Sequence, residues 1–154
     1  MRFRRDGQLR SDGRDVADIA CKGPPSHAGS EALGDPHLRE VPVYLPPAAL
    51  DGEDLPVIFC LAGFTGRGQS MLETHPWKTG AVLAYDRALA ASGAPGCILV
   101  MPDAFTRLGG SQYVNSGATG RYADYVATEL VAFVDSAYPT LAGARAVCGK
   151  SSGG

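Results

Sequence analysis

The residues with the clearest chemical potential form a short run at the end of the chain. Gly149-Lys150-Ser151-Ser152-Gly153 matches the pattern G-x-S-x-G. A serine hydroxyl is a weak nucleophile, so it must be held clear of the backbone and face a base. A sharp strand-to-helix turn does this with strained backbone angles at the serine, and side chains at the flanking glycines would collide with neighbouring backbone. The run predicts a nucleophilic Ser151, although the pattern alone also fits a glycine-rich turn.

The same run imitates the end of a phosphate-binding loop, G-x-x-x-x-G-K-S/T. The upstream glycine, Gly143, lies one position too far from Gly149. The intervening residues 145–148 are typical of a strand, whereas a phosphate loop needs flexible backbone. Spacing and strand pattern therefore disfavour nucleotide binding.

A second glycine-rich segment, 62–68, follows an apolar strand predicted at 56–61. Ester hydrolysis passes through a tetrahedral oxyanion, which needs fixed N–H donors. With a G-x-S-x-G turn, one donor is the residue after the nucleophile, here Ser152, and the other lies in a loop after an earlier strand. Gly63 allows close backbone approach, so we assign the second donor to the N–H of Phe64. The alternative is a simple strand-to-helix turn.

Apolar strands alternate with amphipathic helices in the elements that must position these loops. We expect strands at 56–61, 97–101 and 145–148, and helices at 81–92 and 121–137. Such alternation requires crossover connections and predicts an α/β fold, with a mostly parallel sheet and helices on both faces. In such sheets ligands bind at the carboxyl ends of strands, where both glycine-rich segments fall.

The beginning of the chain has a different character. Residues 1–30 are rich in Arg, Asp and Gly, and we expect a poorly ordered arm with one short strand at most, at 15–20. The folded domain is predicted over 31–154. Its first strand, 39–45, alternates in polarity, but Pro42 cannot donate to a ladder, which predicts an edge strand.

Composition excludes several classes of protein. The chain has 154 residues, room for one domain, and its net charge of −2 argues against nucleic-acid or membrane partners. No apolar run approaches the roughly 18 residues of a membrane span, and no apolar segment follows the basic N-terminus, so we expect a cytoplasmic protein. Cys21, Cys60, Cys97 and Cys148 form no C-x-x-C pair. We expect them to be buried free thiols, with neither metal nor cofactor.

Taken in order, these segments resemble the putative-esterase family of α/β-hydrolases, which includes esterase D, enterochelin-esterase-like and antigen-85-like proteins. The resemblance covers residues 30–154 and rests on motifs at 33–37, 41–47, 61–64, 102–106, 109–116, 119–125 and 149–154. It implies that Ser151 is the nucleophile and that Phe64 and Ser152 donate to the oxyanion. It also implies that the loop 103–116 borders the substrate cleft.

The sequence departs from that family in one large way. The family's catalytic acid and histidine follow the serine, whereas His27, His37 and His75 all precede Ser151 here. We expect His27 and His37 to be solvated; His75, after the oxyanion loop, is a candidate for lining the cleft. The prediction is a serine carboxylic-ester hydrolase truncated after its nucleophile turn, and inactive as it stands.

Several alternatives stay open. The chain fits a non-catalytic truncated product, and an acyltransferase would use the same acyl-serine. A siderophore lactone, a feruloyl ester, an acyl-thioester or a simple short ester would each suit as small-molecule substrate, and the sequence does not set the oligomeric state. Likeness to formylglutathione hydrolases is weakened because Thr65-Gly66 stands where they carry a cysteine. Asp103 is expected in a turn, Lys150 in solvent, and Trp77 in the core or in an acyl pocket.

Overall fold

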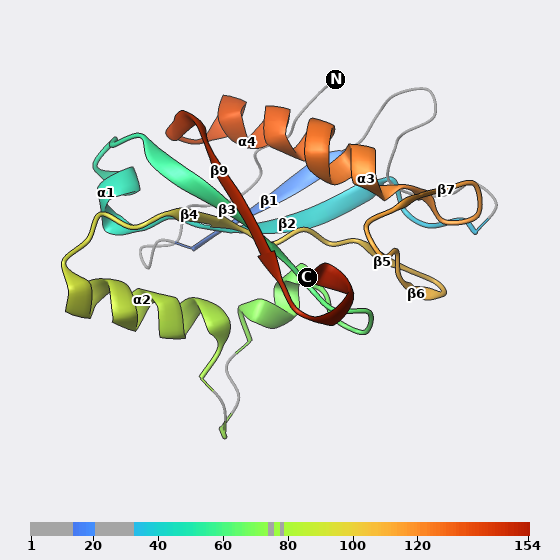
Figure 1. The fold of residues 1–154 in the computed structure, drawn as a ribbon, viewed down its shortest axis with the longest axis horizontal. Coiled ribbons are helices and arrows are strands. Elements are labelled where there is room, and N and C mark those ends of the chain that lie inside the picture. Colours follow the sequence, from blue (N-terminus) through green and yellow to red (C-terminus); the bar gives the residue numbers. More distant parts are fainter. Residues whose placement is uncertain (1–13, 21–32, 74–75, 78) are drawn as a thin grey trace.

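A five-stranded mixed sheet forms the centre of the molecule (Figure 1). The computed structural model describes residues 14–20, 33–73, 76–77 and 79–154. The strand order is β1-β2-β4-β3-β9; β3 runs parallel to β4 and β9, while β2 is antiparallel to both its neighbours. The strands are β1 (Arg14–Ala20), β2 (Leu38–Tyr44), β3 (Leu55–Leu61), β4 (Ile98–Val100) and β9 (Thr140–Gly149).

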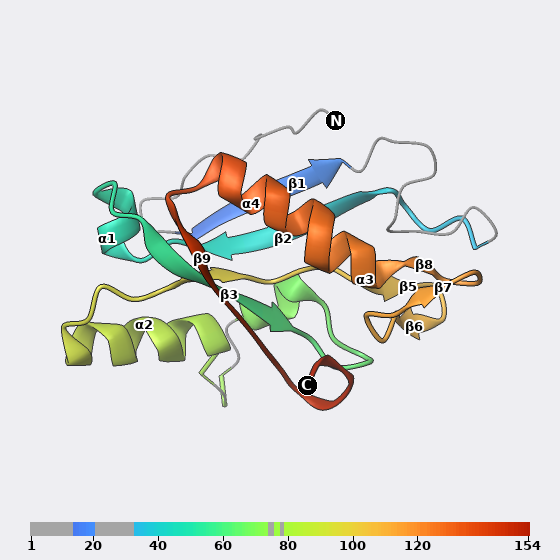
Figure 2. The same ribbon diagram turned by 45° about the horizontal axis from the view of Figure 1, so that its top comes forward.

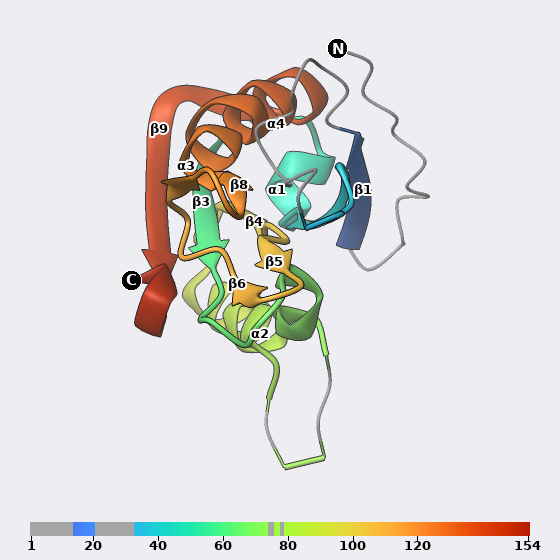
Figure 3. The same ribbon diagram turned by 90° about the vertical axis from the view of Figure 1, so that its right-hand side faces the viewer.

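Helices cover both faces of this sheet (Figure 3). On one face lies α2 (Ala81–Ser92), which has the predicted span and ends at Gly93 with φ +67°. On the other lie α3 (Tyr122–Asp124), the π-helical segment η2 (Tyr125–Leu130) and α4 (Val131–Ala137). The α/β prediction is therefore confirmed. None of the helices described is long and apolar enough to cross a membrane.

Two apolar cores pack against opposite faces of the sheet. The larger lies under α3, η2 and α4, where Tyr125 and Phe133 pack with Val57 and Phe59 of β3. The smaller lies under α2 and centres on Val82, which packs with residues of β2 and β4. Because alternate residues of β3 face opposite sides, its continuous apolar run serves both cores.

The prediction that 39–45 forms an edge strand is wrong. β2 lies between β1 and β4, and Pro42 pairs with Val16 in its interior. The carbonyl of Pro42 accepts a hydrogen bond from Met101 N at 2.9 Å. Because the nitrogen and the carbonyl of a strand residue point to the same side, the nitrogen of Pro42, which carries no hydrogen, also faces β4. The register with β4 covers only Val43 and Tyr44. The proline therefore falls at the end of a short ladder, where it removes a single bond.

The helix predicted at 121–137 is present, but it is not one regular helix. Six residues, Tyr125–Leu130, follow π-helical geometry between two α-helical segments. The π turns bring Tyr125 and Leu130 into the core together with Tyr122. The apolar spacing predicted the buried face, whereas a π-helical insertion has no simple spacing signal.

The last strand is longer than predicted. β9 begins at Thr140, and its register with β3 shifts between Leu55 and Val57. Gly143, with a φ of +77°, lies in this irregular part and interrupts the strand pattern of the sequence. The sequence therefore predicted only the second half of the strand. β9 is the outermost strand of the described sheet, and Val147 is 64% exposed.

Short elements complete the described chain. The segment 104–121 contains two small hairpins, β5 (Phe105–Thr106) with β6 (Gly109–Gly110) and β7 (Asn115–Ser116) with β8 (Gly120–Arg121). The remaining short helices are α1 (Pro47–Leu50), η1 (Gly68–Met71) and η3 (Ser151–Gly153). β1 matches the short strand allowed at 15–20, while residues 1–13 and 21–32 lie outside the described part.

Candidate active site

Ser151 occupies a strained turn directly after β9. Its φ is +57°, in the left-handed region that a side chain seldom adopts. A β-carbon on Gly149 would overlap the carbonyl oxygen of Gly153. The chain then closes into η3, with Gly153 N donating to Lys150 O at 3.0 Å. This is the strand, strained serine and tight helical turn expected for G-x-S-x-G, and both Ser151 and Lys150 are exposed.

The loop after β3 lies against this turn (Figure 2). Leu61 at the end of β3 is in register with Gly149 at the end of β9, so the loops that follow these two parallel strands begin side by side. A β-carbon on Gly63 would lie 3.5 Å from Ser151 Cβ and 3.3 Å from Lys150 O. The structure therefore brings the two glycine-rich segments into contact at the carboxyl edge of the sheet.

Residues 62–66 form a tight turn. Gly66 N donates to Gly63 O at 2.9 Å, and a β-carbon on Gly66 would lie 3.1 Å from Ala62 Cβ. Phe64, between them, is 44% exposed. Its backbone is thus held in the turn, while its partly exposed ring lies against Gly109.

The loop that follows β4 packs on this turn from the side opposite β9, the strand that leads to Ser151. Gly110 N donates to Phe64 O at 2.7 Å, and Tyr113 Oη donates to Ala62 O at 2.9 Å. A β-carbon on Gly109 would lie 2.5 Å from Phe64 Cζ. The segment 103–116 thus contacts the predicted oxyanion loop. Gly110 and Tyr113 belong to the motif 109–116, but sequence analysis predicted no individual role for either residue.

A buried cationic side chain anchors the start of this segment. Arg39 is 2% exposed and donates to Phe105 O and to Tyr122 Oη, both at 2.6 Å. Asp103 lies 3.5 Å from the guanidinium and accepts a hydrogen bond from Phe105 N at 3.1 Å. Burial raises the pKa of Tyr122 to about 12, so the phenol is neutral beside Arg39. Asp103 therefore stabilises a turn through its bond to the Phe105 amide, as expected. Sequence analysis did not predict the role of Arg39.

Of the three histidines, one lies in the described part of the chain. His37 is exposed at the entrance to β2, as expected, whereas His27 and His75 lie outside the described residues. Trp77 is 87% exposed, so the alternative that placed it in the core is wrong, while its place in an acyl pocket stays a prediction.

The expectation that the cysteines are buried is wrong for the three that the structure describes. Cys60, Cys97 and Cys148 are free, but Cys148 is exposed and the other two are only half-buried. Cys148 is exposed because β9 is the outermost described strand. Its Sγ lies 3.6 Å from Sγ of Cys60, the residue in register on β3. Burial, reinforced by Cys148, raises the pKa of Cys60 to about 12, so Cys60 stays a thiol and is a poor nucleophile.

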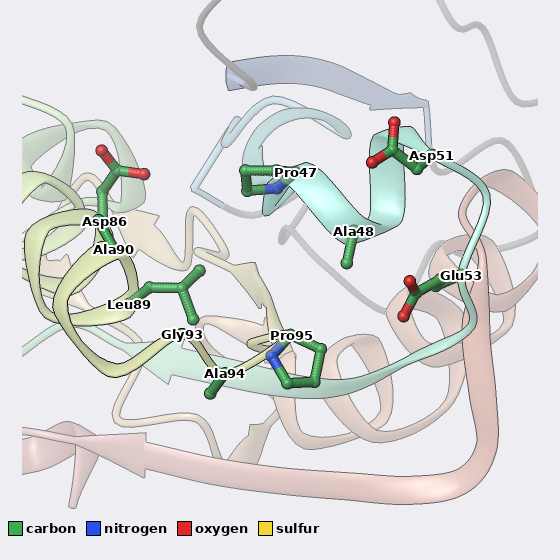
Figure 4. Close-up of a pocket in the computed structure, with 10 residues that line it drawn as sticks. All are labelled: Pro47, Ala48, Asp51, Glu53, Asp86, Leu89, Ala90, Gly93, Ala94 and Pro95. Carbon is green, nitrogen blue, oxygen red and sulfur yellow. The ribbon is translucent and has the colours of Figure 1, made fainter.

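Two hollows lie on the α2 side. An apolar one of about 360 Å³ runs from α2 to the end of β9 and includes Tyr85, Cys60 and Lys150 in its lining. Another, of about 320 Å³, lies between α1 and the end of α2, where Asp51, Glu53 and Asp86 surround an apolar floor (Figure 4). The second hollow lies at the amino ends of β3 and β4, the opposite end from Ser151. Within the described residues no three His, Cys, Asp or Glu side chains gather as a metal site would require.

Comparison with known proteins identifies the family of this chain. The profile of the putative esterase family matches residues 30–154, and the chain belongs to that family. A search of curated proteins found no match.

Solved esterases share the fold. An S-formylglutathione hydrolase from Agrobacterium tumefaciens is 21% identical, with a TM-score of 0.67; the match covers 97% of this chain and 53% of that one. A ferulic acid esterase from Anaeromyces mucronatus is 22% identical, with a TM-score of 0.60, over 97% and 54%. The fluorophosphonate-binding serine hydrolase FphF from Staphylococcus aureus is 17% identical, with a TM-score of 0.61, over 96% and 48%. The chain thus has the α/β-hydrolase fold and spans about half the length of these structures.

Proposed function

We propose that this chain carries the nucleophile and the oxyanion hole of a serine carboxylic-ester hydrolase. Ser151 forms the acyl-enzyme, and the N–H groups of Phe64 and Ser152 bind the oxyanion. The observation that carries the proposal is the left-handed backbone of Ser151 at the end of β9, in contact with Gly63 of the neighbouring loop. Membership of the esterase family supports the same reaction.

The reaction follows from this arrangement. As a base removes its proton, Ser151 Oγ attacks the ester carbonyl carbon, and the carbonyl oxygen becomes an oxyanion held by the two N–H donors. Collapse breaks the bond to the alkoxide, which takes the proton back from the base and leaves. Water then attacks the acyl-serine by the same route and releases the acid.

The base and its orienting acid are proposed to lie outside this chain. His37 is exposed at the start of β2, and Asp103 is held by Arg39 and the Phe105 amide. The chain spans about half of the matching esterases, which leaves room for these groups in a further segment. We call the chain joined to such a segment, from its own reading frame or from a family relative, the completed protein. With its base proposed to lie in that further segment, the chain alone is expected to be inactive.

The substrate is proposed to be a small carboxylic ester. One structural neighbour is described in complex with ferulic acid, and others are described as ferulic acid esterases, which fits an acyl group of that size. Exposed apolar side chains near the turn, Phe64 and Leu108 among them, offer contacts to such a group.

Two serine variants of the completed protein test this proposal. Ser151→Ala should lower hydrolysis of p-nitrophenyl acetate by at least about 1,000-fold, since only binding and the oxyanion hole remain. Ser152→Ala is the matched control, because its proposed role belongs to the backbone N–H, which alanine keeps; its rate should stay within about threefold of the wild type. If Ser151→Ala retained a tenth of the activity, Ser151 would not be the nucleophile.

A further inference from the structure

Three consecutive carbonyl groups of the turn after β3 each accept a hydrogen bond. Ala62 O accepts from Tyr113 Oη at 2.9 Å, Gly63 O from Gly66 N at 2.9 Å, and Phe64 O from Gly110 N at 2.7 Å. Two of the three donors belong to the loop after β4, which is remote in sequence. That loop therefore holds the turn on both sides of the Gly63–Phe64 peptide.

Holding these carbonyls also sets the direction of the N–H groups. A trans peptide is planar, so its C=O and N–H point in opposite directions. The Gly63 carbonyl shares its plane with the Phe64 N–H, and the Ala62 carbonyl shares its plane with the Gly63 N–H. The bond from Tyr113 therefore orients the peptide immediately before the proposed oxyanion donor.

Tyr113 reaches Ala62 only through an unfavourable backbone. Gln112 and Tyr113 have φ values of +59° and +54°, in the left-handed region where a non-glycine residue is strained. Ser111, which is buried, accepts a hydrogen bond from Tyr113 N at 3.3 Å and donates its own N–H to Ala104 O at 3.0 Å. These contacts hold two strained residues in the one arrangement that points the phenol at Ala62.

Burial favours the donor form of this phenol. Tyr113 is half-buried, and desolvation raises its pKa, with a further increase from the charge of Asp103. The hydroxyl thus keeps its proton across the neutral range and donates it to the carbonyl of Ala62.

From these contacts we propose that Tyr113 is a positioning residue for the oxyanion loop: its hydroxyl fixes the Ala62–Gly63 peptide and so the direction of the Phe64 N–H. The inference rests on the proposed ester hydrolysis at Ser151. Tyr113 does not need to touch the substrate, and its effect appears in the transition state, when the oxyanion forms.

The test is Tyr113→Phe in the completed protein, which keeps the ring and removes only the hydroxyl. Losing one oxyanion donor typically costs about 100- to 1,000-fold in kcat, and a misdirected donor should cost less, about tenfold. KM for p-nitrophenyl acetate should stay within about twofold. The affinity for a phenylboronic acid, whose adduct with the serine mimics the oxyanion, should fall by the same factor as kcat.

Tyr85→Phe is the matched control. Its hydroxyl is also half-buried and bonded to backbone, accepting from Cys97 N at 2.6 Å, but it lies on α2. Its kcat and boronate affinity should equal those of the wild type. Equal losses in both variants would show a general structural effect and overturn the positioning role.

A readout independent of turnover completes the test. Amide hydrogen exchange over residues 62–66 should be at least about fivefold faster in Tyr113→Phe than in the wild type, with no change in Tyr85→Phe. Unchanged exchange with unchanged kcat overturns the positioning role. Activity that survives Ser151→Ala defeats the proposed function, whereas the exchange result still decides whether Tyr113 holds the loop.

Discussion

The carbonyl oxygen of Leu61 occupies the place that a β-carbon on Gly153 would need. Leu61 ends β3 and Gly153 closes the turn after β9, so the backbone at the end of β3 packs directly against the turn that carries Ser151. This contact explains why the last position of G-x-S-x-G has to be glycine in this chain.

Gly153→Ala should therefore disrupt the turn. Because the added methyl group would meet backbone atoms, which cannot rotate away, we expect a loss of about 3 kcal/mol in the free energy of unfolding and of most ester turnover. Gly117→Ala is the control, since nothing lies within 4 Å of a β-carbon there. Urea unfolding of both variants in the completed protein measures the difference. Similar losses would mean that the Leu61 contact is not restrictive.

Arg39→Met should destabilise the protein far more than Arg145→Met. Arg39 is buried with Asp103, and its removal leaves a buried carboxylate without its cation, at a cost of about 3 kcal/mol. Arg145 pairs with Asp135 at the surface, where a pair contributes less than about 1 kcal/mol. Denaturant midpoints of the two variants provide the comparison. Equal shifts would contradict the anchoring role of Arg39.

The Tyr122 phenol predicts a stability change at alkaline pH. Its pKa is raised from 10.0 to about 12, so ionisation favours the unfolded chain. Its contribution is fully present below pH 10 and is lost as the pH rises toward 12. Tyr122→Phe cannot ionise, although it also lacks the bond to Arg39. The stability advantage of the wild type over Tyr122→Phe should therefore shrink between pH 9 and pH 11.5 in urea titrations. An advantage independent of pH would be inconsistent with the raised pKa.

Residues 1–154 expressed alone should be inactive and poorly stable. β9 is the outermost described strand, and Leu141 and Val147 are 46% and 64% exposed on it. Such an edge leaves unpaired backbone groups and apolar side chains in water, which favours aggregation. Size-exclusion chromatography, thermal unfolding and an ester assay test this expectation. A soluble monomer with a cooperative transition would contradict the stability argument, and turnover abolished by Ser151→Ala would contradict the chemical one.

Much of the architecture follows from local pattern. The span of α2 was predictable because an amphipathic repeat ends at Gly93, which adopts the left-handed conformation of a helix stop. The contact between Gly63 and Ser151 followed from a general property of parallel sheets, whose loops emerge at one edge. The motif also predicted the strained φ of Ser151.

The remaining features depend on contacts between distant residues. β2 lies inside the sheet although Pro42 lacks an N–H, and a single sequence does not show the strand's neighbours. The hydrogen bond from Tyr113 to the turn after β3 joins residues 51 positions apart. Arg39 stands beside the charged Glu40 in β2, and only the fold shows that Asp103 and Tyr122 surround Arg39.

Covalent labelling of the completed protein by a fluorophosphonate tests the central claim most directly. The reagent reports an activated serine by bonding to its Oγ, and the modified peptide identifies the residue by mass spectrometry. The proposal predicts one adduct, on Ser151, with labelling retained in Ser152→Ala and lost in Ser151→Ala. An adduct on another serine, or ester turnover that continues while Ser151 stays unlabelled, would contradict it.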